Sequence, residues 1–386
     1  MQRSGGLLAT LLLAVTVASA QDGDNFFQKL HLQIHGNAAQ GFLFSSSNNY
    51  LTTKSSDGSA KWTEGSLSVG KAITDRFHVG AQVHSYSLGQ LGRQNVTLDW
   101  AYGDYKFSSY FGIRGGKVKT PFGLYNDVQD VDAVYPWALL PQALYPADSQ
   151  GFGLSHTGGV VYGEFSPSKY VGTFVYQAFG GTRTQPRNGG FDITMAAQGI
   201  SLGDESGPMG GIDLRWRTPL EGFAVGGAYA KIELDAPNAR AGLFPLPMTD
   251  RYQEEQLYTQ FEKGKITLSA EGKLNPVFLS MGPAPASYIP MRSWYAMASY
   301  RATKKLTLGS YYDQTWFFIH NRDRQDPANY LKDVAVSTRF DFDRYFYAKL
   351  EGHFMEGNSV GFYQVVNPNG LAKNTGLLLA RFGFAF

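Results

Sequence analysis

The sequence predicts an all-β fold in which about sixteen antiparallel strands close into a transmembrane β-barrel. Three observations carry this prediction: apolar and polar side chains alternate along about sixteen segments, short turns alternate with long loops, and the last ten residues form a strand with one aromatic face. Successive side chains of a strand point to opposite faces. In a transmembrane barrel the apolar face meets lipid and the polar face lines a wet lumen.

The C-terminal strand gives the clearest example. Phe382, Phe384 and Phe386 share one face, and Arg381 and Gly383 share the other. Lipid outside and water inside accommodate both the aromatic rings and a cation in the middle of the strand. This strand, which ends on Phe386, resembles the C-terminal strand by which outer-membrane barrels are recognised and inserted.

Residues 1–20 have the features of a secretory signal peptide. Arg3 supplies a positive charge, residues 7–17 are apolar but too short to span a bilayer with any margin, and residues 18–20 form a small-residue cleavage site. An N-terminal membrane anchor is the alternative interpretation. We expect a cleaved signal peptide followed by one barrel domain, residues 21–386.

The composition limits the class of function. The chain has no cysteine, although the signal predicts export into an oxidising compartment, so no disulfide framework stabilises it. Aromatic residues make up 15% of the chain and charged residues only 17%, below the roughly 25% charged residues of soluble domains. The formal net charge of +2 gives no basic excess of the kind that binds nucleic acid.

The alternating segments follow one another along the whole chain. In residues 96–103, for example, Leu98, Trp100 and Tyr102 share the apolar parity and Asp99 lies on the polar one, whereas residues 291–301 have no clear parity. The predicted strands include residues 30–37, 64–69, 77–84, 96–103, 110–118, 161–165, a strand from 170, 212–217, 223–229, 257–262, 266–273, 291–301, 306–313, 333–340, 346–354 and 377–386.

The connections between these segments alternate in length. Short turns occur at residues 74–76, 107–109, 166–169, 218–222, 263–265, 302–305 and 341–344, and longer loops rich in Gly, Pro, Asn and Asp lie between them. Bacterial barrels place short turns in the periplasm and long loops outside the cell. A soluble sandwich or propeller is the alternative, but no repeat of about forty residues stands out, as a propeller would show.

Residues 120–150 form the one long segment that is not strand-like. The segment is dense in Pro, Trp and Leu, which argues against disorder, and a loop of this length is usually functional. We therefore expect it to fold back and pack against another part of the chain.

Residues 114–127, with the sequence RGGKVKTPFGLYND, resemble a strand-to-loop signature of porins related to the phosphate-selective group. Together with the barrel pattern and the terminal Phe386, this resemblance to Gram-negative outer-membrane porins extends over most of residues 29–386. The resemblance implies sixteen strands, an outer-membrane location, a homotrimer, and a third extracellular loop, residues 120–150, that folds into the lumen. The dense Lys/Arg ladder of a dedicated phosphate pore is missing, so that selectivity is not transferred.

The resulting prediction is a passive diffusion channel for small hydrophilic solutes and ions, surrounded by outer-membrane lipid and needing no cofactor or metal. Acidic residues of the inserted loop would face basic residues of the wall and set a transverse field across the constriction. A solvated lumen position or a structural ion pair is the alternative for each charge. The candidate residues are Asp127, Asp130 and Asp132 on the loop and Arg114, Arg215, Arg217, Arg339, Lys349 and Arg381 on the wall.

Two other functions are considered: a barrel enzyme, and a non-conducting receptor or adhesin. An enzyme needs a nucleophile and a base within hydrogen-bond reach, and His31, His35, His78 and His84 fall on neighbouring predicted strands. These histidines face inward, however, and the sequence contains neither G-x-S-x-G nor H-E-x-x-H. We therefore expect no catalytic activity.

Overall fold

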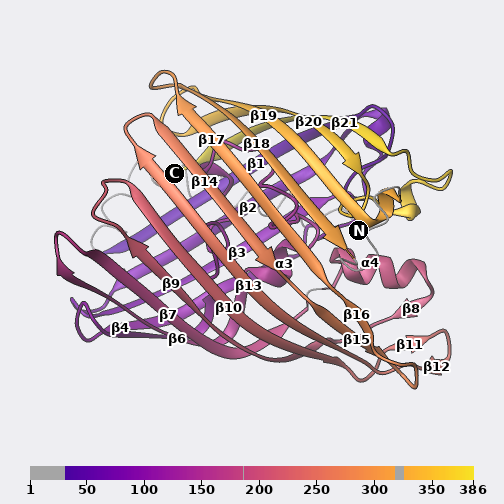
Figure 1. Cartoon of the computed structure of the whole chain (residues 1–386), viewed down its shortest axis with the longest axis horizontal. Coiled ribbons are helices and arrows are strands. Elements are labelled where there is room, and N and C mark those ends of the chain that lie inside the picture. Colours follow the sequence, from indigo (N-terminus) through magenta and orange to yellow (C-terminus); the bar gives the residue numbers. More distant parts are fainter. Residues whose placement is uncertain (1–30, 186, 318–325) are drawn as a thin grey trace.

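The computed structural model describes residues 31–185, 187–317 and 326–386, so the predicted signal peptide lies outside the described residues. The described chain forms a closed antiparallel barrel of sixteen strands, as the sequence predicts (Figure 1). The wall strands are β1 (Leu32–Ser45), β2 (Ser59–Ala72), β3 (Phe77–Leu88), β4 (Val96–Lys106), β5 (Gly112–Lys119), β6 (Ser155–Ser168), β7 (Gly172–Thr184), β9 (Ser206–Arg217), β10 (Phe223–Ala236), β13 (Met248–Lys263), β14 (Ile266–Leu274), β17 (Met291–Arg301), β18 (Leu306–Phe317), β19 (Tyr330–Asp341), β20 (Phe346–Gly357) and β21 (Asn374–Ala385).

Hydrogen bonds between the first and last strands close the wall. β1 pairs with β2 on one side and with β21 on the other, and every other wall strand pairs with its sequence neighbours. β15 (Val277–Met281) extends the wall beyond β14, because both pair with β13, and β16 (Ser287–Ile289) pairs with β15 just before β17 begins. Closure pairs each of the sixteen described wall strands on both sides, which is what a barrel in lipid requires.

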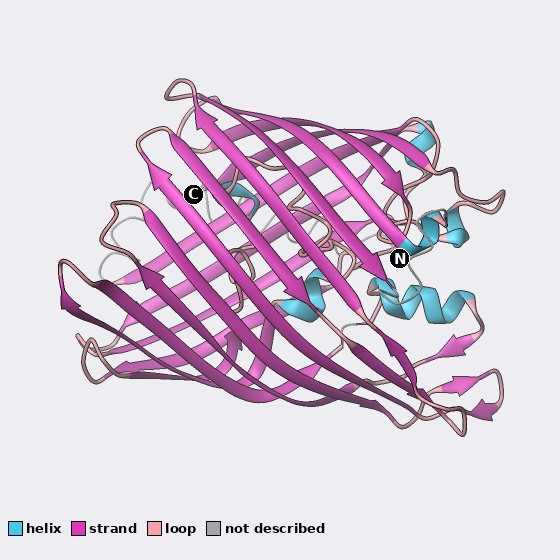
Figure 2. Cartoon of the chain, in the orientation of Figure 1, coloured by secondary structure: helices cyan, strands magenta, loops and turns pink. Residues whose placement is uncertain are grey.

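Short helices and a small sheet belong to the loops. Figure 2 shows these helices inside the wall and at the end of the barrel where the long loops lie. They are η1 (Ser55–Asp57), η2 (Asp132–Val134), α3 (Gln150–Gly153), α4 (Gly190–Ala197), η3 (Pro327–Asn329) and η4 (Gln364–Val366), and the small sheet consists of β8 (Ile200–Ser201), β11 (Arg240–Ala241) and β12 (Phe244–Pro245). Within the described ranges, none of the helices has the length and apolar character needed to cross a membrane.

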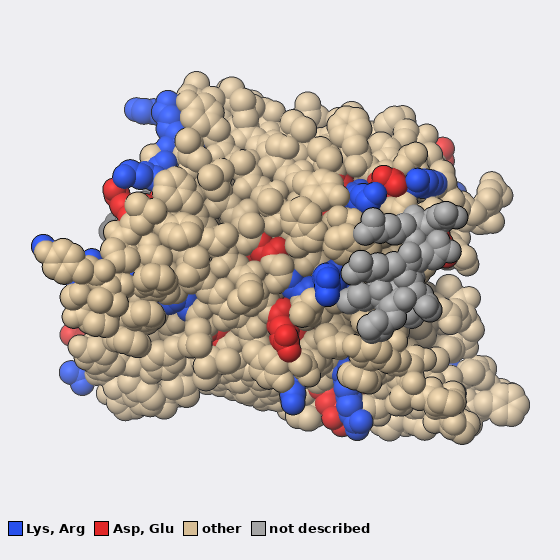
Figure 3. Space-filling view, in the orientation of Figure 1, with Lys and Arg blue, Asp and Glu red and all other residues tan. Residues whose placement is uncertain are grey.

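The outer face of the wall is apolar and the inner face is polar, which confirms the predicted parity of most strands. On β20, Leu350 is 54% exposed on the outside, whereas its neighbours Lys349 and Glu351 are buried inside. On β17, whose parity was ambiguous from sequence, Trp294 points outward and Tyr295 is fully buried. Figure 3 shows that most of the visible outer wall carries no charged side chains; charged side chains lie toward its left and right ends, and a smaller group lies near the middle of this view.

The predicted parity of β4 is wrong in its second half. The pairing of β3 with β4 shifts register at Asp99: Val83 pairs with Leu98, but Gln82 pairs with Trp100. This β-bulge inserts one extra residue into β4, so the alternation reverses after it. Trp100 therefore shares the inner face with Gln82 instead of facing lipid, and it stacks on Tyr102, with ring centroids 5.0 Å apart.

Side chains from the loops and the inner wall form the apolar core, which lies inside the barrel. One cluster joins Leu51 of the first long loop, Leu139 of the loop between β5 and β6, and Leu331 of β19. A second cluster packs Trp137 and Leu140 against wall residues that include Tyr295 and Tyr311. The barrel interior beside β17, β18 and β19 is therefore filled by folded loops.

Replacement of Leu268 on β14 by Lys tests the two faces. Leu268 is 44% exposed on the outer wall, and its neighbour Thr267 has the opposite parity. We expect Leu268→Lys to reduce the free energy of folding into bilayers by about 2–4 kcal/mol, because a cation on the lipid face loses its hydration. Thr267→Lys, the matched control, should cost much less. Urea-dependent folding into lipid vesicles measures both, and equal costs would contradict this topology.

Candidate functional site

The loop between β5 and β6, residues 120–154, lies against the polar inner face of the wall. It is the long segment singled out in the sequence, extended by four residues because α3 precedes β6. Its hydrogen bonds reach strands far away in sequence, among them β2, β9, β14 and β18 to β21. We call this segment the inner loop.

Three cations lie side by side on neighbouring wall strands. The strand register places Arg339 of β19 opposite Lys349 of β20, and Lys349 opposite Arg381 of β21. Like charges directly opposite one another destabilise a sheet. This row of cations therefore requires anionic or strongly polar partners, and the inner loop supplies most of them.

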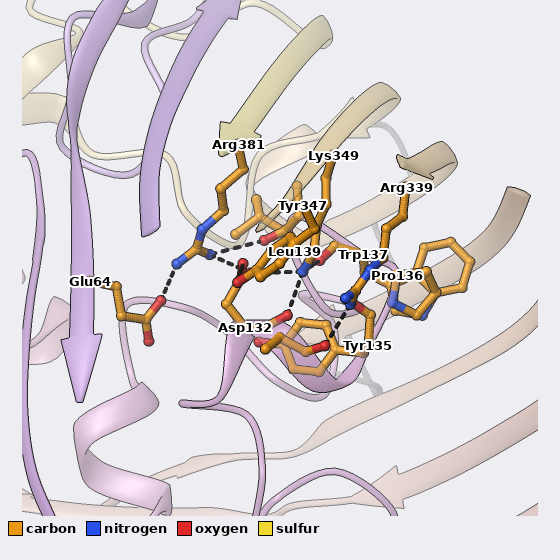
Figure 4. Close-up of polar contacts among 12 residues, drawn as sticks. Glu64, Asp132, Tyr135, Pro136, Trp137, Leu139, Arg339, Tyr347, Lys349 and Arg381 are labelled. Atoms are coloured by element: carbon orange, nitrogen blue, oxygen red, sulfur yellow. Dashed lines mark hydrogen bonds and ion pairs between the residues drawn. The ribbon is translucent and has the colours of Figure 1, made fainter. Parts of the chain in front are cut away.

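Asp132 of η2 is the central partner of the cation row (Figure 4). Its Oδ1 atom lies 2.8 Å from Nζ of Lys349 and 3.1 Å from Nη1 of Arg381, and its Oδ2 atom accepts a hydrogen bond of 2.6 Å from the hydroxyl of Tyr347. On the far side, Arg381 pairs with Glu64 of β2. The side chains of Asp132 and Lys349 are both fully buried, and buried charges persist only when they are paired in this way.

Backbone carbonyl groups of the inner loop accept hydrogen bonds from the same cations. Nζ of Lys349 donates to the carbonyl of Trp137 at 2.7 Å, and Nη1 of Arg339 donates to the carbonyls of Ala133 and Tyr135 at 2.5 and 3.1 Å. A loop buried away from water needs partners for its carbonyl groups. The cations therefore satisfy the loop backbone as well as its carboxylate.

Wall carboxylates complete the attachment by accepting hydrogen bonds from loop N–H groups. Glu351 accepts from the amides of Ala138 and Leu139 at 2.9 and 3.0 Å, and Asp313 accepts from the amide of Ala143 at 3.2 Å. Other carboxylates hold the first part of the loop: Asp213 accepts from Gly123 and Glu271 from Leu124, both at 3.1 Å. The sequence shows these acids as lumen charges, but nothing in it reveals that they bind the loop backbone.

Asp130 fastens the loop to another part of the wall, formed by β3, β4 and β5. Its carboxylate lies 2.7 Å from Nζ of Lys119 and accepts a hydrogen bond of 2.7 Å from Gln82. Lys119 also pairs with Asp99, the residue at the bulge of β4, at 2.8 Å. Sequence reasoning assigned no role to Lys119, although it lies in the recognised motif at the start of the loop.

The surroundings of the loop carboxylates shift their pKa values. Burial alone would raise the pKa of Asp132, but Arg381 and Lys349 outweigh it and hold that pKa below its ordinary value. Burial would also raise the pKa of Asp130, but the charge of Lys119 outweighs this effect, so the pKa of Asp130 is lowered as well. Burial raises the pKa of Asp127 to about 6, although the nearby charge of Arg215 lowers it. The side chain of Asp127 is exposed to water, which counteracts this rise.

The remaining predicted residues are placed differently. Arg114 pairs with Asp104 of β4 at 2.8 Å, and Arg215 donates to the carbonyl of Gly123 at 3.3 Å. Arg217 pairs with Glu164 at 3.1 Å on an exposed part of the wall, and no contact described for it involves the inner loop. The structure thus brings Asp132, Lys349, Arg339 and Arg381 together in one buried network, and Arg114, Arg215 and Arg217 lie outside it.

Two large cavities border the described part of the inner loop, one toward each end of the barrel. The cavity toward the long loops has a volume of about 560 Å³ and is bordered by the inner loop, α4 and β10. The cavity toward the short turns has a volume of about 520 Å³ and is bordered by residues that include Arg339, Lys265 and Arg301. Tyr145, which borders the cavity toward the long loops, and Tyr295 donate hydrogen bonds to Glu271 at 2.6 and 2.5 Å.

The histidines do not assemble into a metal or catalytic centre in the part of the chain that the structure describes. No group of three potential ligands is positioned to hold a metal ion among those residues. His84 is buried with Nε2 3.2 Å from Oε1 of Glu64, which belongs to the network around Arg381.

No protein-family model matches the chain, and no curated protein matches its sequence. Solved structures match its fold. An anion-selective porin from Comamonas acidovorans aligns with a TM-score of 0.59 and 11% identity, over 92% of this chain and 99% of the porin. OmpF of Salmonella typhi, in complex with daunomycin, aligns with a TM-score of 0.57 and 12% identity, over 92% and 97% of the two chains. OmpT, an outer membrane protein of Vibrio cholerae, gives 0.57 and 10% over the same fractions.

Replacement of Lys349 by Met tests the buried network. The change leaves Asp132 and the carbonyl of Trp137 buried without one of their donors, so we expect a loss of about 3–5 kcal/mol in the free energy of unfolding. Lys332→Met is the matched control, because Lys332 pairs with Glu356 at 3.3 Å on a half-exposed surface, and it should cost less than about 1 kcal/mol. Urea-dependent unfolding in bilayers compares them, and similar costs would mean that the network does not stabilise the fold.

The pH dependence of stability provides a separate test of Asp132. Because the pKa of Asp132 is lowered in the folded chain, its contribution is complete at neutral pH and is lost as the pH falls below about 4. We expect Asp132→Asn to lower the melting temperature at pH 7. Between about pH 4 and pH 2, the melting temperature of this variant should fall by less than that of the wild type. An equally large fall in the melting temperature of the variant and the wild type over this acidic range would contradict the assignment.

Proposed function

We propose that this chain, which has the fold of Gram-negative outer-membrane porins, is a passive diffusion channel for small hydrophilic solutes and ions. The observation that carries the proposal is a loop fastened by buried charges to the inner wall of a closed barrel, with a cavity on either side of it. Such a loop narrows the lumen, and under this proposal the width and charge of the path past it decide what passes.

The candidate constriction residues divide into two roles under this proposal. Asp130, Asp132, Lys349 and Arg381 are nearly inaccessible to water, so they anchor the inner loop and do not line the path. Asp127 is exposed, and we assign it to the water-filled path. The transverse field predicted from sequence is thus weakened, because most of its opposing charges neutralise one another in contact.

We propose a modest preference for anions. The short-turn cavity is bordered by four cations, Lys265, Arg301, Lys304 and Arg339, and by two carboxylates, Glu262 and Asp341. The balance is four minus two, a surplus of two positive charges. A channel mouth with surplus positive charge concentrates anions. One of the structures with the same fold is described as an anion-selective porin.

The surroundings of the channel follow from the same proposal. We infer a location in the outer membrane, reached through a signal peptide at residues 1–20, and assembly as a homotrimer. The apolar outer face of the wall and the outer-membrane proteins that share the fold support the location. One of those structures is described as a trimer form. We propose no catalytic activity, since His84, one of the four histidines that the enzyme alternative would use, is buried beside Glu64 and is closed off from a solute in the lumen.

Deletion of residues 128–138 tests the channel and its constriction together. The deletion removes Asp130, Asp132 and the buried Trp137, so the lumen should widen and the single-channel conductance in a planar bilayer should rise above that of the wild type. Deletion of residues 240–245, an outer hairpin that includes the exposed Phe244, is the matched control and should leave the conductance unchanged. A wild-type barrel that never conducts would refute the channel, and equal conductance in both deletions would refute the constriction.

A further inference from the structure

The cavity toward the long loops differs chemically from a water-filled passage. Its volume of about 560 Å³ falls within the roughly 300–1,000 Å³ of pockets that bind small organic molecules. Phe122, Met209, Ala230 and Ile232 border it on one side and pack together as a single apolar cluster. A passage for small hydrophilic solutes alone has no need of such a surface.

Further apolar side chains come from the long loops. Phe191 of α4, Phe362 of the last long loop and Met291 at the start of β17 border the same cavity, and all three are only half-buried. Half-buried aromatic and thioether side chains around a cavity leave apolar surface in contact with water. A solute with an apolar body would cover that surface, which is favourable because apolar area leaves water.

The charged residues that border the cavity balance. Two are cations, Arg183 and Lys273, and two are carboxylates, Asp148 and Glu254. Lys273 and Glu254 pair with each other at 2.8 Å. The sum of formal charges is zero, so the cavity attracts neither anions nor cations as a class, in contrast to the cation surplus of the short-turn cavity.

Polar atoms with unused hydrogen-bonding capacity also border the cavity. Oδ1 of Asn275 and Oγ of Ser359 are buried and make no hydrogen bond to any described residue. A buried polar atom without a partner is unfavourable, and a ligand or a water molecule relieves the cost. An apolar surface beside such atoms fits a solute that has an apolar body and hydroxyl or carbonyl groups.

We propose that this cavity, the outer vestibule of the barrel, is a binding site for an uncharged amphipathic organic solute, with an apolar or aromatic body and several hydroxyl groups. The inference rests on the proposed channel function, because it names the class of solute that pauses in the channel before crossing the inner loop. The apolar body lies against the cluster of Phe122 and Ile232, and the hydroxyl groups hydrogen-bond to Asn275 and Ser359, whose buried polar atoms turn toward the cavity when the solute binds.

Calorimetric titration of the protein in lipid nanodiscs with three probes tests the site. Phenyl β-D-glucopyranoside, which has a ring and hydroxyl groups, should bind at least about tenfold more tightly than glucose, because burial of the ring adds to the affinity. Benzoate, which has the ring and a charge, should bind more weakly than the glucoside. Equal affinities for the glucoside and glucose would overturn the proposal, as would preferential binding of benzoate.

Two variants locate the site, and one controls for general effects. Phe191→Ala and Met291→Ala should each weaken glucoside binding by about threefold or more. Phe244→Ala, at a 78% exposed position outside the cavity lining, should leave it unchanged. Equal affinities of the three variants for the glucoside would overturn the placement of the site in this cavity. The heat-modifiable gel shift of each variant shows that it is folded. Ion conductance of the same preparation separates the two proposals: conduction without glucoside binding refutes only the site, and binding without conduction refutes only the channel.

Discussion

The arrangement of the barrel interior depends on one electrostatic constraint, the row of Arg339, Lys349 and Arg381 across three paired strands. Three like charges at sheet spacing repel one another, and the lumen on this side offers them little water because folded loops fill it. Asp132 relieves the repulsion by sitting between two of the cations. The inner loop therefore stays against the wall because, without Asp132, the repulsion among the three cations would be unrelieved.

The same constraint explains why the interior is asymmetric. The loop is attached to β19, β20 and β21 through the cation row, and Trp137 and Leu139 fill the space beside it with apolar contacts. The cavity toward the long loops instead borders β9 and β10, where Met209 and Ile232 form the inner surface. The loop contacts around the cation row are thus tightly packed, and the remaining space lies in the two cavities on either side of the inner loop.

The sequence predicts the wall well and the loop attachment poorly, for physical reasons. Alternation with a period of two is a local property, so the parity of β20 or β21 follows from a few neighbouring residues. A bulge breaks this rule, as at Asp99, because the extra residue has no signature of its own in the sequence. The contact between Asp132 and Lys349 spans 217 residues, so their charges can be proposed as opposed but not as paired.

The acids that hold the loop show a second limit of prediction. Glu351 and Asp213 alternate with apolar residues in the sequence, which places them on the polar face of predicted strands but assigns them no partner. In the structure they accept hydrogen bonds from loop amides, a role that depends on where an irregular segment places its backbone. Such a role follows from the general need of buried amides for partners, but the particular partners emerge only from the folded chain.

Cysteine modification within the lumen tests most directly the claim that the inner loop borders the water-filled path. The chain has no cysteine, so Asp127→Cys introduces a single thiol at an exposed position of the loop. A bulky, water-soluble methanethiosulfonate reagent added during single-channel recording should lower the conductance of this variant in discrete steps. The same reagent should leave the conductance of the Leu308→Cys variant unchanged, because position 308 lies on the lipid face. Labelling of Cys at position 127 with no change in conductance would contradict the account.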